Sequence, residues 1–223
     1  MKSTLPAKLT SLLPSQSPVQ SYFQRHFLNH PHRQSGTPAR LRTGLFLCVT
    51  VATALTACQQ APVMSTDQRL QLGLGVAQSA RLKDAEKVLT TVLQEYQQTQ
   101  NTAGIAKASF GLAELYKSKR YQDQLTPPST TEHYQQAATL YVQSAQAYQS
   151  LNRPALQASA LVGAANAYLL SDQVAPACTT FAQAQDLAEL PAVKADQEAY
   201  NTLTRSMRFF SDLAVVCALA QPL

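Results

Sequence analysis

The sequence predicts an all-α fold for the part of the chain that follows Cys58. That part is dense in Ala, Gln and Leu, contains no Trp and has only five glycines. Ala, Leu and Gln are strong helix formers, whereas Gly weakens a helix interior. No stretch alternates apolar and polar residues in the β-branched-rich pattern that is typical of a strand. Its 166 residues are enough for one domain with its own core.

A short tether and three helices are expected first. Residues 58–65 read as a polar tether, and the first helix follows over residues 67–79, with Ser65 and Thr66 as candidate caps. Two further helices are expected over residues 82–99 and 102–118. The second carries one apolar stripe, made of Leu82, Ala85, Leu89, Val92 and Tyr96.

A proline pair then interrupts the helices. Residues 119–129 contain Pro127 and Pro128 and are expected to form a loop, because proline removes a backbone donor and breaks helices. Thr130 or Thr131 is the expected cap of a fourth helix, which reaches residue 151.

Three later helices are each opened by a proline. Asn152 is the expected cap of the fifth, which has Pro154 in its first turn and ends near residue 171. Pro176 opens a sixth helix that ends near residue 190, and Pro191 opens a long seventh. The seventh carries an apolar stripe, made of Val193, Tyr200, Leu203, Met207, Phe210, Ala214 and Cys217.

The two cysteines of the predicted fold are expected to stay apart. If the chain turns near Leu190, Cys178 faces about residue 202, and Cys217 lies roughly 22 Å further along the helix axis. A disulfide needs Cα atoms within about 7 Å. The bond could form only if the seventh helix broke, for which Ser211-Asp212 is the candidate place. The regular stripe favours an unbroken helix and two separate, mostly buried thiols.

The segment before the fold, RLRTGLFLCVTVATALTACQQ over residues 40–60, is the stretch most suited to lipid. Its run of about fourteen uncharged residues is too short to span a bilayer, which takes ~20. Arg40 and Arg42 precede the apolar run and small residues end it, which is the order of a secretory signal peptide. A core helix would show a polar face every 3.6 residues. We therefore expect residues 40–57 to be a signal peptide.

Residues 1–39 are rich in Pro, Ser, Gln and His and contain no acidic residue. They are expected to be a disordered or removed leader, or the product of a start codon assigned too early, with translation beginning near Leu28. We exclude them from the predicted fold.

The basic charge of the chain belongs to these early segments. The whole chain carries a net charge of +5, but six basic residues and no acidic residue precede Cys58. The remainder has twelve basic residues against thirteen acidic ones, a net charge of −1. That balance predicts no nucleic-acid partner, because phosphate backbones are bound by an excess of Lys and Arg.

The end of the signal segment, Leu55-Thr56-Ala57-Cys58, resembles the lipobox of bacterial lipoproteins. The resemblance implies cleavage before Cys58 and its acylation, for example with palmitate, so that two or more acyl chains hold the protein on a bilayer. Gln59 stands where an aspartate would signal inner-membrane retention, which implies the outer membrane, facing the periplasm. The alternative is a buried thiol at a helix end.

Two helices share a short motif. Gly111-Leu-Ala-Glu-Leu-Tyr116 and Gly163-Ala-Ala-Asn-Ala-Tyr168 align in glycine, alanine and tyrosine, and Gly73 with Ala77 is a weaker third copy. The following helices share small, large and small residues at one spacing, as in Ala85-Leu89-Val92, Ala137-Tyr141-Ser144 and Ala177-Phe181-Ala184.

This pattern resembles the tetratricopeptide repeat over residues 66–190. The resemblance implies a right-handed α-solenoid of about three helical hairpins, with residues 191–223 as a C-terminal capping helix. The glycines lie 38 and 52 residues apart, not at the regular spacing of about 34, and the repeat's Trp and closing Pro are mostly absent. An irregular helical bundle is the alternative.

No catalytic or metal-binding pattern is found in the sequence. His133, the one histidine after Cys58, has no nucleophile and orienting partner nearby and reads as an exposed surface residue. One histidine with Cys178 and Cys217 makes no metal-ligand pattern. We expect neither an enzyme nor a cofactor.

The resemblance implies instead a groove for a peptide or a partner helix, lined by the first helix of each hairpin. By repeat position it is lined by Asp67, Leu70, Gln71, Leu74, Gln78, Ala108, Ser109, Leu112, Tyr116, Gln157, Ala160, Ala164, Asn166 and Tyr168. The candidate binding residues among these are Gln71, Gln78, Ser109, Leu112, Tyr116, Gln157, Asn166 and Tyr168. Alternatively, the two tyrosines belong to the hairpin core, with hydroxyls at its rim.

The expected function is that of a lipid-anchored adaptor or scaffold that binds an envelope protein or peptide, in support of assembling an envelope complex. The alternative is a structural spacer that forms a homo-oligomer through its own groove.

Overall fold

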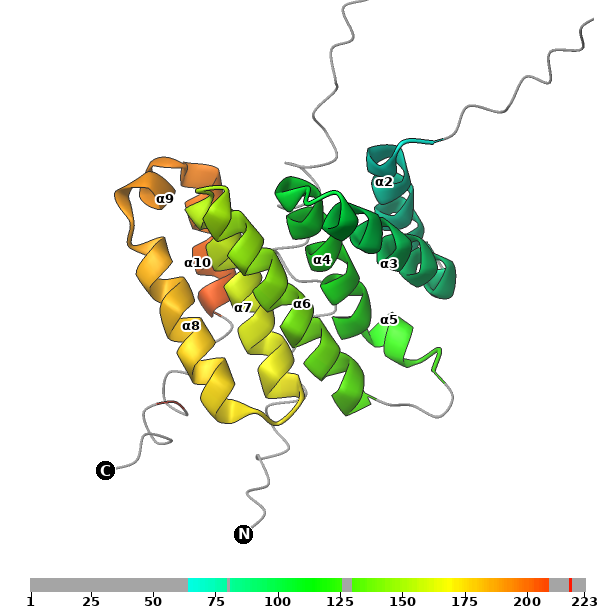
Figure 1. Cartoon of the computed structure of the whole chain (residues 1–223). Helices are drawn as coiled ribbons and strands as arrows, with labels where there is room; N and C mark the ends of the chain where they lie inside the picture. The colour runs from blue at the N-terminus through cyan, green and yellow to red at the C-terminus, as the bar shows by residue number, and fades with distance from the viewer. Residues whose placement is uncertain (1–63, 80, 126–129, 209–216, 218–223) are drawn as a thin grey trace, which may run out of the picture.

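The computed structural model describes residues 64–79, 81–125, 130–208 and 217. Within these ranges all regular secondary structure is helical, which confirms the expected all-α class (Figure 1). The helices are α2 (Thr66–Ala77), α3 (Leu82–Gln98), α4 (Thr102–Lys117), α5 (Lys119–Gln122), α6 (Thr130–Ser150), α7 (Pro154–Leu170), α8 (Val174–Ala188), α9 (Pro191–Ala195) and α10 (Gln197–Arg208).

Helix α2 begins where its capping residue predicts. The Ser65 hydroxyl accepts a hydrogen bond from the Gln68 backbone N–H, and the Gln68 side chain accepts one from the Ser65 N–H at 2.9 Å. This reciprocal pair satisfies two backbone donors that a helix start leaves without partners. The stripe predicted for α3 is buried along its whole length.

Part of the expected loop at residues 119–129 is helical. The Ser118 side chain accepts a hydrogen bond from the Tyr121 N–H and so caps the four-residue helix α5. Tyr121 and Gln122 are both buried, and this burial holds the short helix against its neighbours. The two prolines of this segment lie outside the described residues.

Three turns between helices share one geometry, and Asn152 belongs to it. Gln100, Asn152 and Asp172 have positive φ angles of 52°, 53° and 60°. In each turn the next backbone N–H donates to a tyrosine carbonyl five residues earlier, at distances of 2.8–3.0 Å, which closes the preceding helix end. The tyrosines are Tyr96, Tyr148 and Tyr168. The prediction that Asn152 caps α7 is therefore wrong, since it terminates α6 instead.

The long seventh helix is divided at Asp196. Helix α9 ends at Ala195, and the Asp196 carboxylate accepts a hydrogen bond from the Ala199 N–H at 3.0 Å at the start of α10. A carboxylate in this position stabilises a new helix start. The predicted unbroken helix is therefore wrong. The sequence did not show the break, because Val193 before it and Tyr200 after it keep a seven-residue, helix-like spacing.

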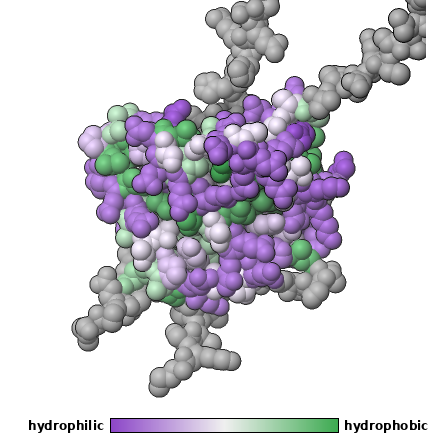
Figure 2. Space-filling view, in the orientation of Figure 1, coloured by the Kyte–Doolittle hydropathy of each residue, from purple (hydrophilic) through white to green (hydrophobic). Residues whose placement is uncertain are grey.

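Neighbouring helices along the chain pack side by side, and alternate helices also touch. Helix α2 contacts α4, α4 contacts α7, and α7 contacts α10. We call these four helices the α2–α4–α7–α10 row, with α3, α6 and α8 as the intervening helices. Within the described range, Ala103 is the one exposed residue of α4, whereas α3, α6 and α8 each have a solvent face. Figure 2 shows that hydrophilic residues cover most of the visible face.

Two glycines lie at close helix contacts, as the repeat motif predicts. A Cβ atom added to Gly163 would lie 2.6 Å from the ring of Tyr141, which is fully buried. A Cβ atom added to Gly111 would meet the end of the Leu74 side chain, which is only half-buried. The ring of Tyr141 is enclosed on all sides and cannot move away from an added Cβ atom, whereas the Leu74 side chain can change rotamer.

Replacing Gly163 with Ala should therefore lower the free energy of unfolding by about 1–3 kcal/mol, and Gly111→Ala should cost less. Gly75 is the matched control, because an added Cβ meets nothing there within 4 Å. Gly75→Ala should raise stability by up to ~1 kcal/mol, because Ala favours helix more than Gly. Urea denaturation followed by circular dichroism measures all three. If Gly163→Ala and Gly75→Ala lowered the free energy of unfolding equally, crowding by Tyr141 would not explain the effect at position 163.

Candidate functional site

The predicted groove residues divide into accessible and buried groups. Gln71 on α2 and Gln78, the residue directly after it, are exposed, and Gln157, Asn166 and Tyr168 are half-buried on α7. Both helices pack against α4, so the two sets flank the same helix. All five side chains are uncharged and carry hydrogen-bonding groups.

Ser109 and Leu112 belong to the core of the fold. The Ser109 hydroxyl is fully buried and donates to the Gln143 side-chain oxygen at 3.0 Å, between α4 and α6. Leu112 is buried among the apolar residues of α2, α3 and α4. These two residues stabilise helix packing and are not available to a partner. Repeat position alone does not reveal which side chains a neighbouring helix covers.

Tyr116 lies in an aromatic cluster that also contains Tyr121 and His133. The three rings are 5.4–5.6 Å apart, centre to centre. The Tyr116 hydroxyl donates to a Glu86 carboxylate oxygen at 3.0 Å, and the Gln122 amide donates to the Tyr116 carbonyl. His133 is thus half-buried against two tyrosines and is not the exposed surface residue that the sequence suggests. The cluster joins α3, α4, α5 and α6.

The electrostatics of this cluster favour a structural role. Burial, followed by the nearby Glu86 carboxylate, raises the pKa of both Tyr116 and Tyr121 above its ordinary value. Both hydroxyls therefore remain protonated near neutral pH and act as hydrogen-bond donors. A nucleophile or general base would need the opposite shift.

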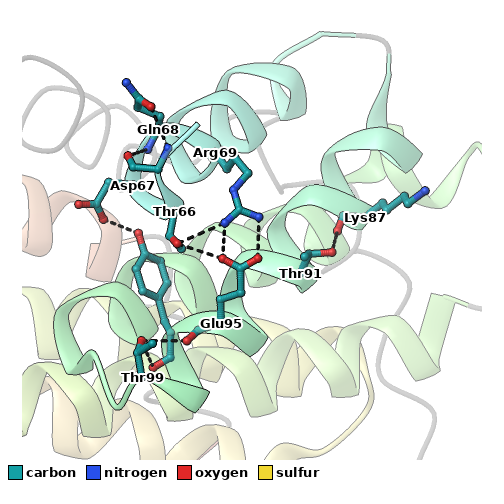
Figure 3. A network of polar contacts seen from close by, with 10 residues as sticks. Thr66, Asp67, Gln68, Arg69, Lys87, Thr91, Glu95 and Thr99 are labelled. Carbon is teal, nitrogen blue, oxygen red and sulfur yellow. Dashed lines mark hydrogen bonds and ion pairs between the residues drawn. The ribbon is translucent and has the colours of Figure 1, made fainter. Parts of the chain in front are cut away.

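A second polar network fastens α2 to α3 (Figure 3). Arg69 donates from both terminal nitrogens to the Glu95 carboxylate, with one contact at 2.6 Å, and Thr66 donates to the same group. The Tyr96 hydroxyl on α3 donates to the Asp67 carboxylate on α2. The hydrogen bond from Arg69 lowers the pKa of Glu95. These contacts use the charged groups of α2 on its α3 side.

A third polar group lies between α4 and α6. The Lys117 ammonium and the Glu114 carboxylate form an ion pair at 3.0 Å, and each side chain is only 11% exposed. The hydroxyl of the fully buried Tyr141 donates to the same Glu114 oxygen, and the Lys117 nitrogen lies 5.0 Å from the Tyr141 ring centre. Burial and the neighbouring carboxylate raise the pKa of Tyr141. This group links two packed helices.

Cys178 and Cys217 form a disulfide, with their Cα atoms 5.5 Å apart. The expectation of two separate thiols is therefore wrong. Its premise was an unbroken seventh helix, and the break at Asp196 removes that premise. The sequence signal that could have revealed the bond is the aspartate at position 196, in the predicted seventh helix. Cys58 and the signal segment lie outside the described residues.

No group of three or more His, Cys, Asp or Glu residues that could hold a metal ion occurs in the described parts of the chain. None of the described helices combines the length and hydropathy that a bilayer-spanning segment needs. No protein-family model, characterised protein or solved structure matches the chain.

Proposed function

We propose that this protein is a lipid-anchored, periplasm-facing scaffold that binds an envelope protein or peptide through tetratricopeptide-like helix pairs. The observation that carries the proposal is the α2–α4–α7–α10 row with its intervening helices. Stacked helix pairs of this kind produce the extended binding surfaces of α-solenoids. The proposal includes the right-handed course and the roughly three hairpins expected from the sequence.

The disulfide supports export of the protein. Disulfides persist in oxidising compartments such as the bacterial periplasm and are rare in the cytosol. The bond between Cys178 and Cys217 thus agrees with a signal peptide at residues 40–57. In the proposed route Cys58 is acylated after cleavage, and Gln59 directs the protein to the outer membrane.

Replacing Cys58 with Ser should abolish acylation and leave the protein unprocessed or released from membranes. The reason is that the thiol is the acceptor of the acyl group, and serine does not replace it. Membrane fractionation and mass spectrometry of the intact chain measure the change. Cys48 lies inside the apolar run and is the matched control, so Cys48→Ser should be processed normally. A Cys58→Ser protein that fractionates like the parent rejects the anchor.

The proposed partner surface consists of the accessible uncharged residues of the row. Gln71 on α2 and Gln78 directly after it, together with Gln157, Asn166 and Tyr168 on α7, offer amide and phenol groups that can hydrogen-bond an extended peptide. No charge on these side chains would select an acidic or basic ligand. We propose neither nucleic-acid binding nor enzymatic activity.

Site-specific photocrosslinking in intact envelopes tests this surface. A photoreactive amino acid at Gln71 or Gln78 should yield an adduct of one defined mass with an envelope protein. Gln146, which is exposed on the intervening helix α6, is the control position and should yield none. Adducts only between copies of this chain would favour the second candidate function, a self-associating spacer.

A further inference from the structure

Helix α2 lies at one end of the described fold and packs on α3 and α4 (Figure 1). Away from those helices it presents a ridge of residues spaced four apart. We call this ridge the α2 stripe, and it consists of Met64, Gln68 and Leu72, of which Met64 lies two residues before the first residue of the helix. Met64 and Leu72 are 44% and 46% exposed, the two most exposed large apolar side chains of the described residues. Gln68 and Leu72 lie four residues apart, which is only about 40° beyond a full turn, so both are on the same side of α2.

The surroundings of the α2 stripe are uncharged. The exposed residues that follow Asp67 on this helix are glutamine, leucine and glycine. The charges that α2 does carry are used on its α3 side, where Arg69 pairs with Glu95 and Asp67 accepts from Tyr96 (Figure 3). A Cβ atom added to Gly75 would meet nothing, so the backbone is open to close approach there. Contact with an apolar layer would thus desolvate no free charge on this face.

The chain places this face close to the proposed anchor. Met64 follows Cys58 by six positions in the sequence. At about 3.3–3.6 Å per residue a fully extended chain of this length reaches roughly 20 Å. If Cys58 is acylated, Met64 cannot leave the near vicinity of the bilayer surface, whereas α8 and α9 lie at the opposite side of the fold from α2 (Figure 1).

We propose that the α2 stripe docks on the lipid bilayer that holds the Cys58 anchor and so fixes the orientation of the helical array, with its α8–α10 end pointing away from the membrane. The inference rests on the proposed lipidation. The acyl chains supply the affinity, and the stripe adds a second contact within an already bound molecule. Such a tethered contact acts at a high effective concentration, so a small apolar area is enough to bias orientation.

The test uses the acylated protein in vesicles of phosphatidylethanolamine and phosphatidylglycerol. Leu72→Cys and Met64→Cys variants carry a thiol-linked fluorophore, and some of the lipids carry a short-range quencher in their acyl chains. The native disulfide stays closed because no reductant is added. Gln183→Cys on α8 is the control, because position 183 is equally open to label but lies at the other end of the fold. We expect several-fold stronger lipid quenching at positions 64 and 72 than at 183.

Mass spectrometry of the same samples separates the two proposals. If Cys58 carries no acyl group, the proposed function fails before the docking is tested. If Cys58 is acylated but quenching at position 72 equals that at 183, the docking inference is overturned and the anchor stands. Protection of position 72 from both lipid and aqueous quenchers, with self-quenching that grows with the protein-to-lipid ratio, would show that a second copy covers the stripe and would also overturn the inference.

Discussion

Replacement of Glu114 with Leu should lower the free energy of unfolding by about 3–5 kcal/mol. Glu114 is the partner of the Lys117 ammonium and the acceptor of the Tyr141 hydroxyl, and only 11% of the lysine side chain is exposed. Removing the carboxylate leaves a largely desolvated charge without its partner and a fully buried hydroxyl without its acceptor. Both losses act on the folded state, at the contact between α4 and α6.

Companion variants separate the two losses. Glu114→Gln keeps an acceptor for Tyr141 and removes only the charge, so it should be less destabilising than Glu114→Leu. Adding Lys117→Met to Glu114→Leu removes the unpaired ammonium and should recover a large part of the stability, because an ion pair replaced by apolar residues is often neutral. Urea denaturation of the parent, Glu114→Leu, Lys117→Met and the double variant gives the coupling energy. A loss below about 1 kcal/mol for Glu114→Leu would mean that the pair behaves like a solvated surface pair.

Helices α2, α3, α4, α6, α7 and α8 could be predicted from the sequence, because each leaves a local signal. Ser65 marks the start of α2 with its capping box, and Pro154 stands at the first position of α7. The stripe from Leu82 to Tyr96 has the helical period and is buried as that period requires. Gly163 could be placed at a close contact, because it recurs with Ala165 and Tyr168 in the motif of Gly111.

The features that the sequence did not predict depend on residues distant along the chain. Ser109 and Leu112 occupy groove positions in the predicted repeat, but α6 and the α2–α3 pair determine what covers them. His133 has only Glu132 as a chemically relevant neighbour in sequence, and its aromatic contacts come from Tyr116 and from the short helix α5. Local patterns describe which face a residue takes, but not which element lies against that face.

The same limitation explains the disulfide. Apolar periodicity cannot distinguish one long helix from two that keep the same register across a single non-helical residue. Asp196 ends α9, and its side chain caps α10 directly afterwards. The apolar stripe therefore continues on α10 with the same spacing. A distance calculated along a straight axis from Leu190 then places Cys217 far from Cys178, whereas the structure has their Cα atoms 5.5 Å apart.

Replacing both Cys178 and Cys217 with Ala should lower the free energy of unfolding by about 4 kcal/mol, because the bond closes a loop with a sequence separation of 39 residues and restricts the unfolded chain. Both side chains are half-buried against the larger core cluster, so alanine leaves little unsatisfied polarity and the loss reports mainly the cross-link. Urea denaturation of the parent under oxidising conditions and of the double variant measures it. The reduced parent is the control and should lose a similar amount.

The way in which the double Cys→Ala variant loses stability along the chain tests whether the α2–α4–α7–α10 row and its intervening helices unfold as one cooperative unit. Removal of a cross-link that acts on the unfolded chain lowers the stability of every segment that unfolds together with it. Hydrogen exchange should therefore show reduced protection in α4 and α6 as well as in α7 and α8, although the bond touches only α8 and residue 217. Loss confined to α8–α10 would mean that this end opens on its own. Thiol titration of the denatured, unreduced monomer provides the underlying check, since two free thiols after Cys58 would contradict the bond itself.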